Sequence, residues 1–466
     1  MIPAPAAVAA AAEDAATDSG GGMGNRYCGA CRGERGCRDC TAAVRAAKYA
    51  GLTEFSAEGL FQGDVPQEAA APGGTASEHS FGMPEALLLA ADIGTTTLGF
   101  VCADEQGRVL ASYGVENPQR QTAADVIGRI DAACRGAGTQ LKKQIREALA
   151  EGFLFVLKRA ESLFAEPGAA WERLPVRIAL AGNTTMQHLL LGYPLDGMAK
   201  APFCPYSVGE VHVSFASLFS ETAAYAGLPD TVKEAGVFVF PCLSAFVGGD
   251  VLAGAYALSF PGVAGGVGKE NGSYLLADLG TNGELLLSVS GNVYATAAAM
   301  GSAFEGGRFA YAADLFRLMS DALRRGAADE TGLFCEPYFT EGFSGLYQED
   351  VRTFQLAKGA VRAGIEVLCR YAGIDTGQIT TVFLAGGAGR YCRTGDLLRT
   401  GFMPEEFRGK LRVVGNSCIG GLLRYLSSPG ERLHCAGEVI NLAERPEFEE
   451  LYYRWMEFPD SVPEKT

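Results

Sequence analysis

Two short loops carry the residue types that hold phosphate groups. Residues 92–97 read Asp-Ile-Gly-Thr-Thr-Thr, and residues 278–284 read Asp-Leu-Gly-Thr-Asn-Gly-Glu. Each loop follows an apolar run, so a carboxylate ends an expected strand and precedes a turn rich in N–H and hydroxyl groups. The turn can hold phosphate oxygens, and the carboxylate can hold Mg²⁺ through water. A matched pair favours this use, and the alternative is that both aspartates only cap turns of a repeated scaffold.

Two further glycine-rich segments have candidate roles. Gly386 and Gly387 follow an expected strand, where a nucleoside can lie against the backbone, or where the chain only makes a tight turn into a helix. Residues 248–250, Gly-Gly-Asp, open an expected helix whose N-terminal dipole favours an anion. Asp250 is either a catalytic group there or a helix cap. His188 lies among apolar residues at helical spacing, and this pattern favours a core histidine over a catalytic one.

Four cysteines form a C-x2-C-x5-C-x2-C cluster, in a chain with 13 cysteines. Cys28, Cys31, Cys37 and Cys40 can hold an iron–sulfur cluster through four thiolates, and we favour 4Fe-4S. The same thiolates can hold zinc, and an unligated cluster is the third alternative. The other nine cysteines are scattered, which fits a reducing cytoplasm better than a disulfide framework.

An internal repeat predicts the elements that position these loops. Residues 87–113 read as a strand, a polar turn, a strand, a tight turn at 104–107 and a third strand, and the same order returns from Ser273. Residues 177–185 match 381–389. Residues 237–250 match 411–421, where we expect Gly420 and Gly421 to open a helix. Residues 139–160 have helical spacing. The sequence therefore predicts two homologous α/β halves whose strand-end loops face a shared cleft.

Composition sets the domain boundaries and excludes some function classes. The formal net charge of −15 over 466 residues argues against a nucleic-acid binder and a polybasic membrane protein, and no apolar run reaches a membrane span. The Ala-rich opening lacks the basic start of a secretory signal. We expect a flexible tail at 1–25, a Cys-rich segment at 26–51, a linker at 52–85, the two halves at 86–262 and 273–430, and a C-terminal extension at 431–466.

The paired loops resemble those of the superfamily of acetate and sugar kinases, heat-shock chaperones and actin, and within it the ATP-dependent reductive activators of corrinoid proteins. Further motifs carry this resemblance over residues 86 to 425: they lie at 182–194, 246–250, 303–306 (Ala-Phe-Glu-Gly), 355–360 (Gln-Leu-Ala-Lys-Gly-Ala) and 385–387. The resemblance implies a duplicated actin-like (RNase H-like) ATPase fold. Family members commonly carry a full ferredoxin domain, and the short Cys-rich segment stands in its place here.

The resemblance also implies an activity. Such an activator uses ATP to return the cobalt of a corrinoid protein from Co(II) to Co(I) for a methyltransferase system. It implies a low-potential electron donor, a homodimer and Mg²⁺. The expected catalytic residues are Asp92, Asp278 and Asp250; the expected nucleotide-binding residues are Gly94, Thr95, Thr96, Thr97, Gly280, Thr281, Asn282, Gly283, Glu305, Gly386 and Gly387. The alternatives are a small-molecule kinase of the same superfamily and an ATP-regulated interaction module with a zinc knuckle.

Overall fold

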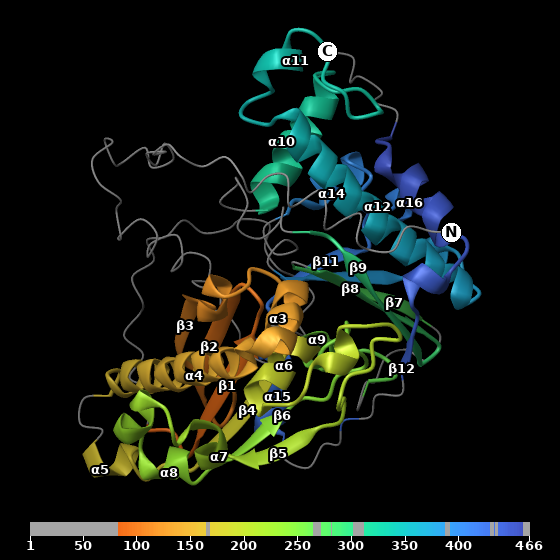
Figure 1. Cartoon of the computed structure of the whole chain (residues 1–466). Coiled ribbons are helices and arrows are strands. Elements are labelled where there is room, and N and C mark those ends of the chain that lie inside the picture. Colours follow the sequence, from red (N-terminus) through yellow and green to blue (C-terminus); the bar gives the residue numbers. More distant parts are fainter. Residues whose placement is uncertain are drawn as a thin grey trace. The chain divides into compact units, whose positions relative to one another are not determined.

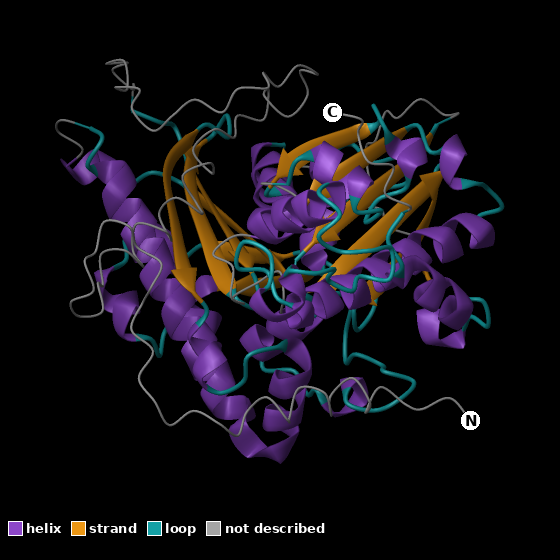
Figure 2. Cartoon of the chain, turned by 90° about the horizontal axis from the view of Figure 1, so that it is seen from above, coloured by secondary structure: helices purple, strands orange, loops and turns teal. Residues whose placement is uncertain are grey.

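The structure of the protein is a computed structural model that describes residues 83–164, 168–263, 272–280, 282–301, 312–386, 392–428, 433 and 437–459. The four cysteines of the expected metal site lie outside the described residues, as do the expected tail and nearly all of the expected linker. Within the described part of the chain, the strands form two six-stranded sheets (Figures 1 and 2).

The first half of the described chain builds one sheet, in the order β3-β2-β1-β4-β6-β5. Its strands are β1 (Leu87–Ile93), β2 (Thr97–Asp104), β3 (Val109–Glu116), β4 (Val176–Gly182), β5 (Val211–Ser214) and β6 (Gly236–Val239). Its helices are α3 (Val126–Ala132), α4 (Gly138–Glu161), α5 (Gly168–Trp171), α6 (Thr184–Leu191), α7 (Phe215–Phe219), α8 (Asp230–Lys233) and α9 (Gly249–Ala257).

The second half repeats this plan in the order β11-β10-β7-β8-β9-β12. Its strands are β7 (Ser273–Leu279), β8 (Asn282–Val289), β9 (Asn292–Ala299), β10 (Thr381–Ala385), β11 (Leu411–Gly415) and β12 (Gly437–Val439). Its helices are α10 (Ala312–Arg324), α11 (Tyr338–Glu341), α12 (Gln348–Tyr371), α14 (Thr394–Arg399), α15 (Ser417–Ser427) and α16 (Phe448–Met456). Strands β7 to β11 pair as β1, β2, β3, β4 and β6 do, which confirms the predicted duplicated α/β fold.

The sequences of the strands are mostly apolar because both faces of each sheet are covered. β1, for example, has the sequence Leu-Leu-Leu-Ala-Ala-Asp-Ile and is buried at every position except the aspartate. On one face of the first sheet, α4 contributes a stripe at helical spacing that includes Leu141, Ile145 and Leu149. α12 covers the second sheet in the same way.

A third buried cluster joins the two sheets through α9 and α15. It combines residues of β1, such as Leu88 and Ala90, with residues of β7 and β8 and with the apolar faces of both helices. α15 packs on β1 and β4 although it follows β11 in sequence. Glycines permit a close helix contact: a Cβ at Gly421 would lie 1.8 Å from the Ala253 carbonyl oxygen. α9 and α15 therefore form the packed joint between the halves (Figure 1).

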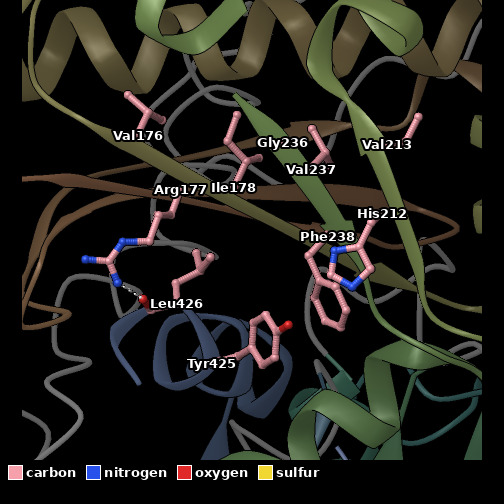
Figure 3. Close-up of a pocket in the computed structure, with 10 residues that line it drawn as sticks. All are labelled: Val176, Arg177, Ile178, His212, Val213, Gly236, Val237, Phe238, Tyr425 and Leu426. Carbon is pink, nitrogen blue, oxygen red and sulfur yellow. Dashed lines mark hydrogen bonds between the residues drawn. The ribbon is translucent and has the colours of Figure 1, made fainter. Parts of the chain in front are cut away.

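A pocket of about 380 Å³ lies where α15 ends against the first sheet (Figure 3). The rings of Phe238 and Tyr425 stack at its wall with centroids 4.1 Å apart, and an Arg177 N–H donates to the Leu426 carbonyl. The pocket is at the N-terminal ends of β4 and β6; its lining residues also include Val176, Ile178, His212, Val213, Gly236 and Val237. It is thus at the opposite end of the strands from Asp92, roughly 17 Å along β1.

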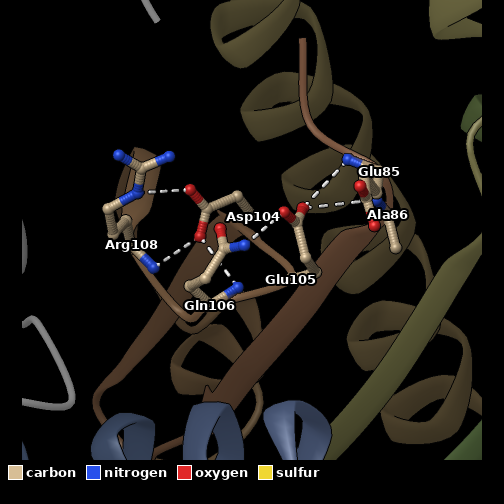
Figure 4. Close-up of polar contacts among 6 residues, drawn as sticks. All are labelled: Glu85, Ala86, Asp104, Glu105, Gln106 and Arg108. Atoms are coloured by element: carbon tan, nitrogen blue, oxygen red, sulfur yellow. Dashed lines mark hydrogen bonds and ion pairs between the residues drawn. The ribbon is translucent and has the colours of Figure 1, made fainter. Parts of the chain in front are cut away.

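The predicted tight turn at 104–107 is confirmed, and Asp104 explains it (Figure 4). Its Oδ1 accepts hydrogen bonds from the backbone N–H groups of Gln106, at 3.1 Å, and Arg108, at 2.8 Å. Arg108 also pairs with its Oδ2 at 2.6 Å. Gly107 has φ +81°, a conformation that glycine adopts readily. The carboxylate therefore fixes the hairpin between β2 and β3.

Candidate functional site

The two loop aspartates occupy equivalent places in the two sheets. Each is the penultimate residue of its strand, and each is half-buried. Asp92 is paired with Ala181 on the neighbouring parallel strand, and Asp278 is paired with Ala385. A glycine follows each of these alanines. The repeat seen in the sequence therefore places two carboxylates at matching strand ends.

Gly386 shows why this loop position needs a glycine. Its φ is +78°, and a Cβ there would lie 2.4 Å from Asp278 Oδ1 and 2.6 Å from the Leu279 carbonyl oxygen. Its counterpart Gly182 is equally constrained, because a Cβ would lie 2.6 Å from the Ile93 carbonyl oxygen. In both halves the backbone passes directly against the strand end that carries the aspartate.

The N-terminus of α15 reaches the first-half aspartate. Asn416 Nδ2 donates a hydrogen bond to Asp92 Oδ2 at 2.8 Å. Cys418 is buried, and burial together with the charges of Asp92, Asp250 and Asp278 raises the pKa of its thiol far above the usual value. The charges of all three predicted catalytic carboxylates thus act on one residue in the first turn of α15, and we call these three aspartates the carboxylate cluster.

Asp250 lies in the first turn of α9, where Gly248 is the N-cap residue. Its Oδ1 accepts a hydrogen bond from the Val251 N–H at 2.9 Å, so the side chain does contact the helix end. Burial and then the nearby Asp92 charge raise its pKa to about 7. A carboxyl that titrates near neutrality suits proton transfer, while the cap position belongs to Gly248.

A buried arginine, Arg129, donates a hydrogen bond to the 94–97 turn. Arg129 is fully buried, and one Nη2 hydrogen bond reaches the Thr95 carbonyl oxygen at 2.6 Å. Burial lowers its pKa to about 10. Asn183, the N-cap of α6, donates to Thr95 Oγ1 at 2.8 Å. Asn117 donates to the Gly94 carbonyl oxygen at 2.9 Å.

The predicted nucleotide-binding residues differ in how they are bonded and buried. Thr95 is bound within the protein and anchors the turn, whereas Thr96 and Thr97 remain half-buried. In the second loop, the Gly280 N–H donates to the Asn282 carbonyl oxygen at 2.9 Å. The structure packs Gly283 against the core, since a Cβ there would lie 2.9 Å from Met300 Sδ. Thr281, Glu305 and Gly387 lie outside the described residues.

The described residues contain no group of three or more His, Cys, Asp or Glu side chains arranged to hold a metal ion. A magnesium ion would therefore need oxygen ligands beyond these side chains, such as phosphate oxygens and water, which is its usual manner of binding. A cation beside Asp92 and Asp250 would relieve the repulsion through which the Asp92 charge raises the pKa of Asp250.

Comparison with known proteins places this geometry in a family. Residues 87–261 match the model of the RACo middle region. Residues 273–313 and 343–465 match the model of the C-terminal domain of RACo, the ASKHA domain. Together the two matches cover most of the chain. The chain belongs to the RACo family.

One relative and one solved structure are similar to this chain. The corrinoid activation enzyme RamQ of Eubacterium limosum is 26% identical over a match of 447 residues, and the match covers 80% of this chain and 70% of RamQ. The solved structure of a reductive activator for corrinoid, iron-sulfur protein has a TM-score of 0.64 at 22% identity, and covers 82% of this chain and 67% of its own. The ASKHA match and this structure confirm the predicted actin-like fold.

The match to the RACo C-terminal domain skips 314–342. In the structure this stretch holds most of α10, all of α11 and the loops around them, with Leu333 and Phe339 exposed. No helix of the described residues is both long and apolar enough to cross a membrane.

His188 of the RACo middle region is a core side chain, as its apolar neighbours predict. It is buried, and its Nδ1 lies 2.8 Å from the Thr184 carbonyl oxygen. Burial lowers its pKa.

The sequence reasoning missed Asn416, Cys418 and Arg129. A signal existed for Asn416, because an asparagine before an apolar helical run is a common N-cap. The helix prediction placed the start at Gly420 and Gly421, and this was wrong: α15 begins at Ser417, so these glycines lie inside its first turns. Arg129 gave no signal, since an arginine at one helix position reads as a surface residue.

Proposed function

We propose that this protein is an ATP-dependent reductive activator of a corrinoid protein. It would use ATP hydrolysis to help return Co(II) cobalamin to Co(I) for a methyltransferase system. Support comes from the RACo family match and from the hydrogen bond by which Asn416, before α15 of the second half, reaches Asp92 of the first half. We also propose that it works in the cytoplasm as a homodimer and takes its electron from a low-potential donor.

We propose specific roles at the carboxylate cluster. Asp92 and Asp278 would orient the Mg²⁺–ATP phosphates from the two strand ends, while the 94–97 turn and Gly386 would contact the phosphates and the nucleoside. Asp250, whose pKa is about 7, would accept the proton of the attacking water as the bond to the γ-phosphate breaks. Bound magnesium supplies charge neutralisation to the phosphates.

The first experiment measures ATP hydrolysis by Asp92→Asn and Asp278→Asn. Each variant should lose at least about 100-fold in kcat, since each removes an oriented charge at the phosphates. Asp230→Asn is the matched control, because Asp230 is exposed and its only described ion pair is with Lys233. Wild-type rates in both cluster variants would overturn the assignment. A phosphorylated small-molecule product would instead identify a kinase.

We further propose that Cys28, Cys31, Cys37 and Cys40 hold an iron–sulfur cluster, with 4Fe-4S favoured and zinc as the rival. Four thiolates are the full protein ligand set for either group. A bound cluster supplies one-electron redox chemistry, which zinc lacks.

The test replaces Cys31 and Cys37 by serine under anaerobic conditions. Visible absorption and iron content should both fall to background, and Co(II) reduction should stop while ATP hydrolysis continues. Zinc without iron in the wild-type protein would contradict the cluster. Corrinoid reduction at the normal rate by the double variant would contradict the relay role.

A further inference from the structure

Asn416 makes two hydrogen bonds with opposite ends of its amide. Its Oδ1 accepts from the Ile419 N–H at 2.9 Å, and its Nδ2 donates to Asp92 Oδ2 at 2.8 Å. The Ile419 N–H can only donate, so the amide oxygen must face it. The amide nitrogen must then face Asp92. The orientation of this side chain is therefore fixed by its two partners.

The support behind Asn416 is rigid. α15 is held to α9 by the glycine contact at Gly421 and by Arg424, which donates to the Tyr256 carbonyl oxygen at 2.6 Å and to Ser259 Oγ at 2.7 Å. Asn416 thus reaches Asp92 from a helix that is 324 residues away in sequence and packed in the core.

Asp92 needs such a restraint. It lies at a strand end, and its charge repels that of Asp250, whose pKa it raises. Repulsion among carboxylates favours side-chain rotation away from the cluster. A neutral N–H donor opposes that rotation without adding charge.

We propose that Asn416 is a positioning residue for ATP hydrolysis: anchored as the N-cap of α15, it holds the Asp92 carboxylate in the orientation that the reaction uses. The inference rests on the proposed function and assigns a residue that acts on the reaction through Asp92.

Substitutions of Asn416 can separate its role as the N-cap of α15 from its role in positioning Asp92. Asn416→Asp and Asn416→Ser both keep an oxygen that can cap α15, but neither keeps the amide N–H that reaches Asp92. Asn416→Ala removes both functions. Asn441 is the matched control: it accepts from the Ala443 N–H at 3.2 Å and donates to Glu444 Oε1 at 2.8 Å, on the exposed surface.

Steady-state ATP hydrolysis and thermal unfolding are measured on the full chain. Asn416→Ser should keep a melting temperature close to that of the wild type, while kcat falls about 10- to 100-fold and the KM for ATP changes less than kcat. Asn416→Asp places a further carboxylate against Asp92, so it should lose both melting temperature and kcat. Asn416→Ala should lose both melting temperature and kcat, and Asn441→Asp should change neither.

A wild-type kcat in Asn416→Asp and Asn416→Ser would overturn the inference and leave Asn416 as a helix cap. In Asn416→Ser, a fall in kcat that only follows a fall in melting temperature would overturn it too. If the wild type itself does not hydrolyse ATP, the proposed function fails first, so the two failures are distinguishable.

Discussion

At the scale of single residues, Asp250 has the property that most directly ties geometry to reactivity. Burial and the Asp92 charge hold its pKa at about 7, well above the ordinary value for an aspartic acid. Below that pH the carboxyl is protonated and cannot accept a proton. Above it the carboxylate is available as a base.

The titration of Asp250 should therefore appear in the pH dependence of ATP hydrolysis. In the wild type, kcat/KM should fall as the pH drops through about 7, because this parameter reports groups of the free enzyme. Asp250→Asn should lower kcat about 100- to 10,000-fold and remove that acidic limb. If the residual kcat/KM of Asp250→Asn still falls as the pH drops through about 7, the group that titrates is not Asp250.

Residue types and spacing predict Asp92, Asp278 and the glycines beside them, because each lies at a strand end inside a local motif. The same reasoning cannot find the contact between Asn416 and Asp92. It depends on where α15 packs, and the two residues are 324 positions apart. The roles of buried polar residues such as Arg129 cannot be predicted from the sequence for the same reason, because their partners come from distant segments.

At the scale of elements, the α9–α15 contact depends on the missing side chain of Gly421. A Cβ there would lie 1.8 Å from the Ala253 carbonyl oxygen and 2.5 Å from its carbon, so the two helices would have to separate. Gly421→Ala should cost about 1–3 kcal/mol in the free energy of unfolding, measured by urea denaturation.

The matched control is Gly395→Ala in α14. A Cβ at Gly395 would have no atom within 4 Å, and alanine favours a helix over glycine by about 0.5–1 kcal/mol. This variant should be as stable as the wild type or slightly more stable. Equal stability of the two variants would show that α9 and α15 can separate without cost.

Lys358 of α12 holds the end of α16. It is fully buried, and its Nζ donates to the carbonyl oxygens of Trp455 and Glu457. Burial and the neighbouring Arg362 lower its pKa to about 7, while the charge of Glu457 opposes the shift. Gln355, one turn earlier, donates to the Met456 carbonyl oxygen at 3.1 Å. The Gln-Leu-Ala-Lys-Gly-Ala motif thus binds the C-terminal helix.

This lysine should give stability a pH dependence. Between pH 7 and about 10 the unfolded chain binds a proton at Lys358 that the folded chain has released, so its contribution to stability rises with pH, by up to about 1.4 kcal/mol per unit. Urea unfolding of Lys358→Met from pH 7 to 9 should lack that rise. Lys143→Met, at an exposed position of α4, should keep it. Parallel curves for wild type and Lys358→Met would contradict the shift.

Long elements with a clear period were predictable, and short ones were not. The helix expected at 139–160 is α4, Gly138–Glu161. β5 and β12 have four and three residues, too few for a period to show, and each is stabilised by pairing at a sheet edge. Their existence follows from the neighbouring strands more than from their own residues.

At the scale of the whole molecule, the duplication predicts a shared response to nucleotide. Saturating Mg²⁺–ATP should slow amide hydrogen exchange in both 92–97 and 278–284, since one ligand would contact both loops. The hairpin at 104–108 is the internal control, because the carboxylate of Asp104 fixes it independently. Protection of one loop alone would contradict a site formed by both halves.

The placement of α15 has a consequence for biosynthesis. The face of the first sheet that carries Leu88 and Ala90 is covered in part by Ile419 and Leu422, which leave the ribosome more than 300 residues later. At a synthesis rate of about 5–20 residues per second, that face stays uncovered for on the order of tens of seconds. The nascent first half therefore exposes an apolar surface throughout that interval, and a fragment ending before α15 would keep it exposed and be prone to aggregate.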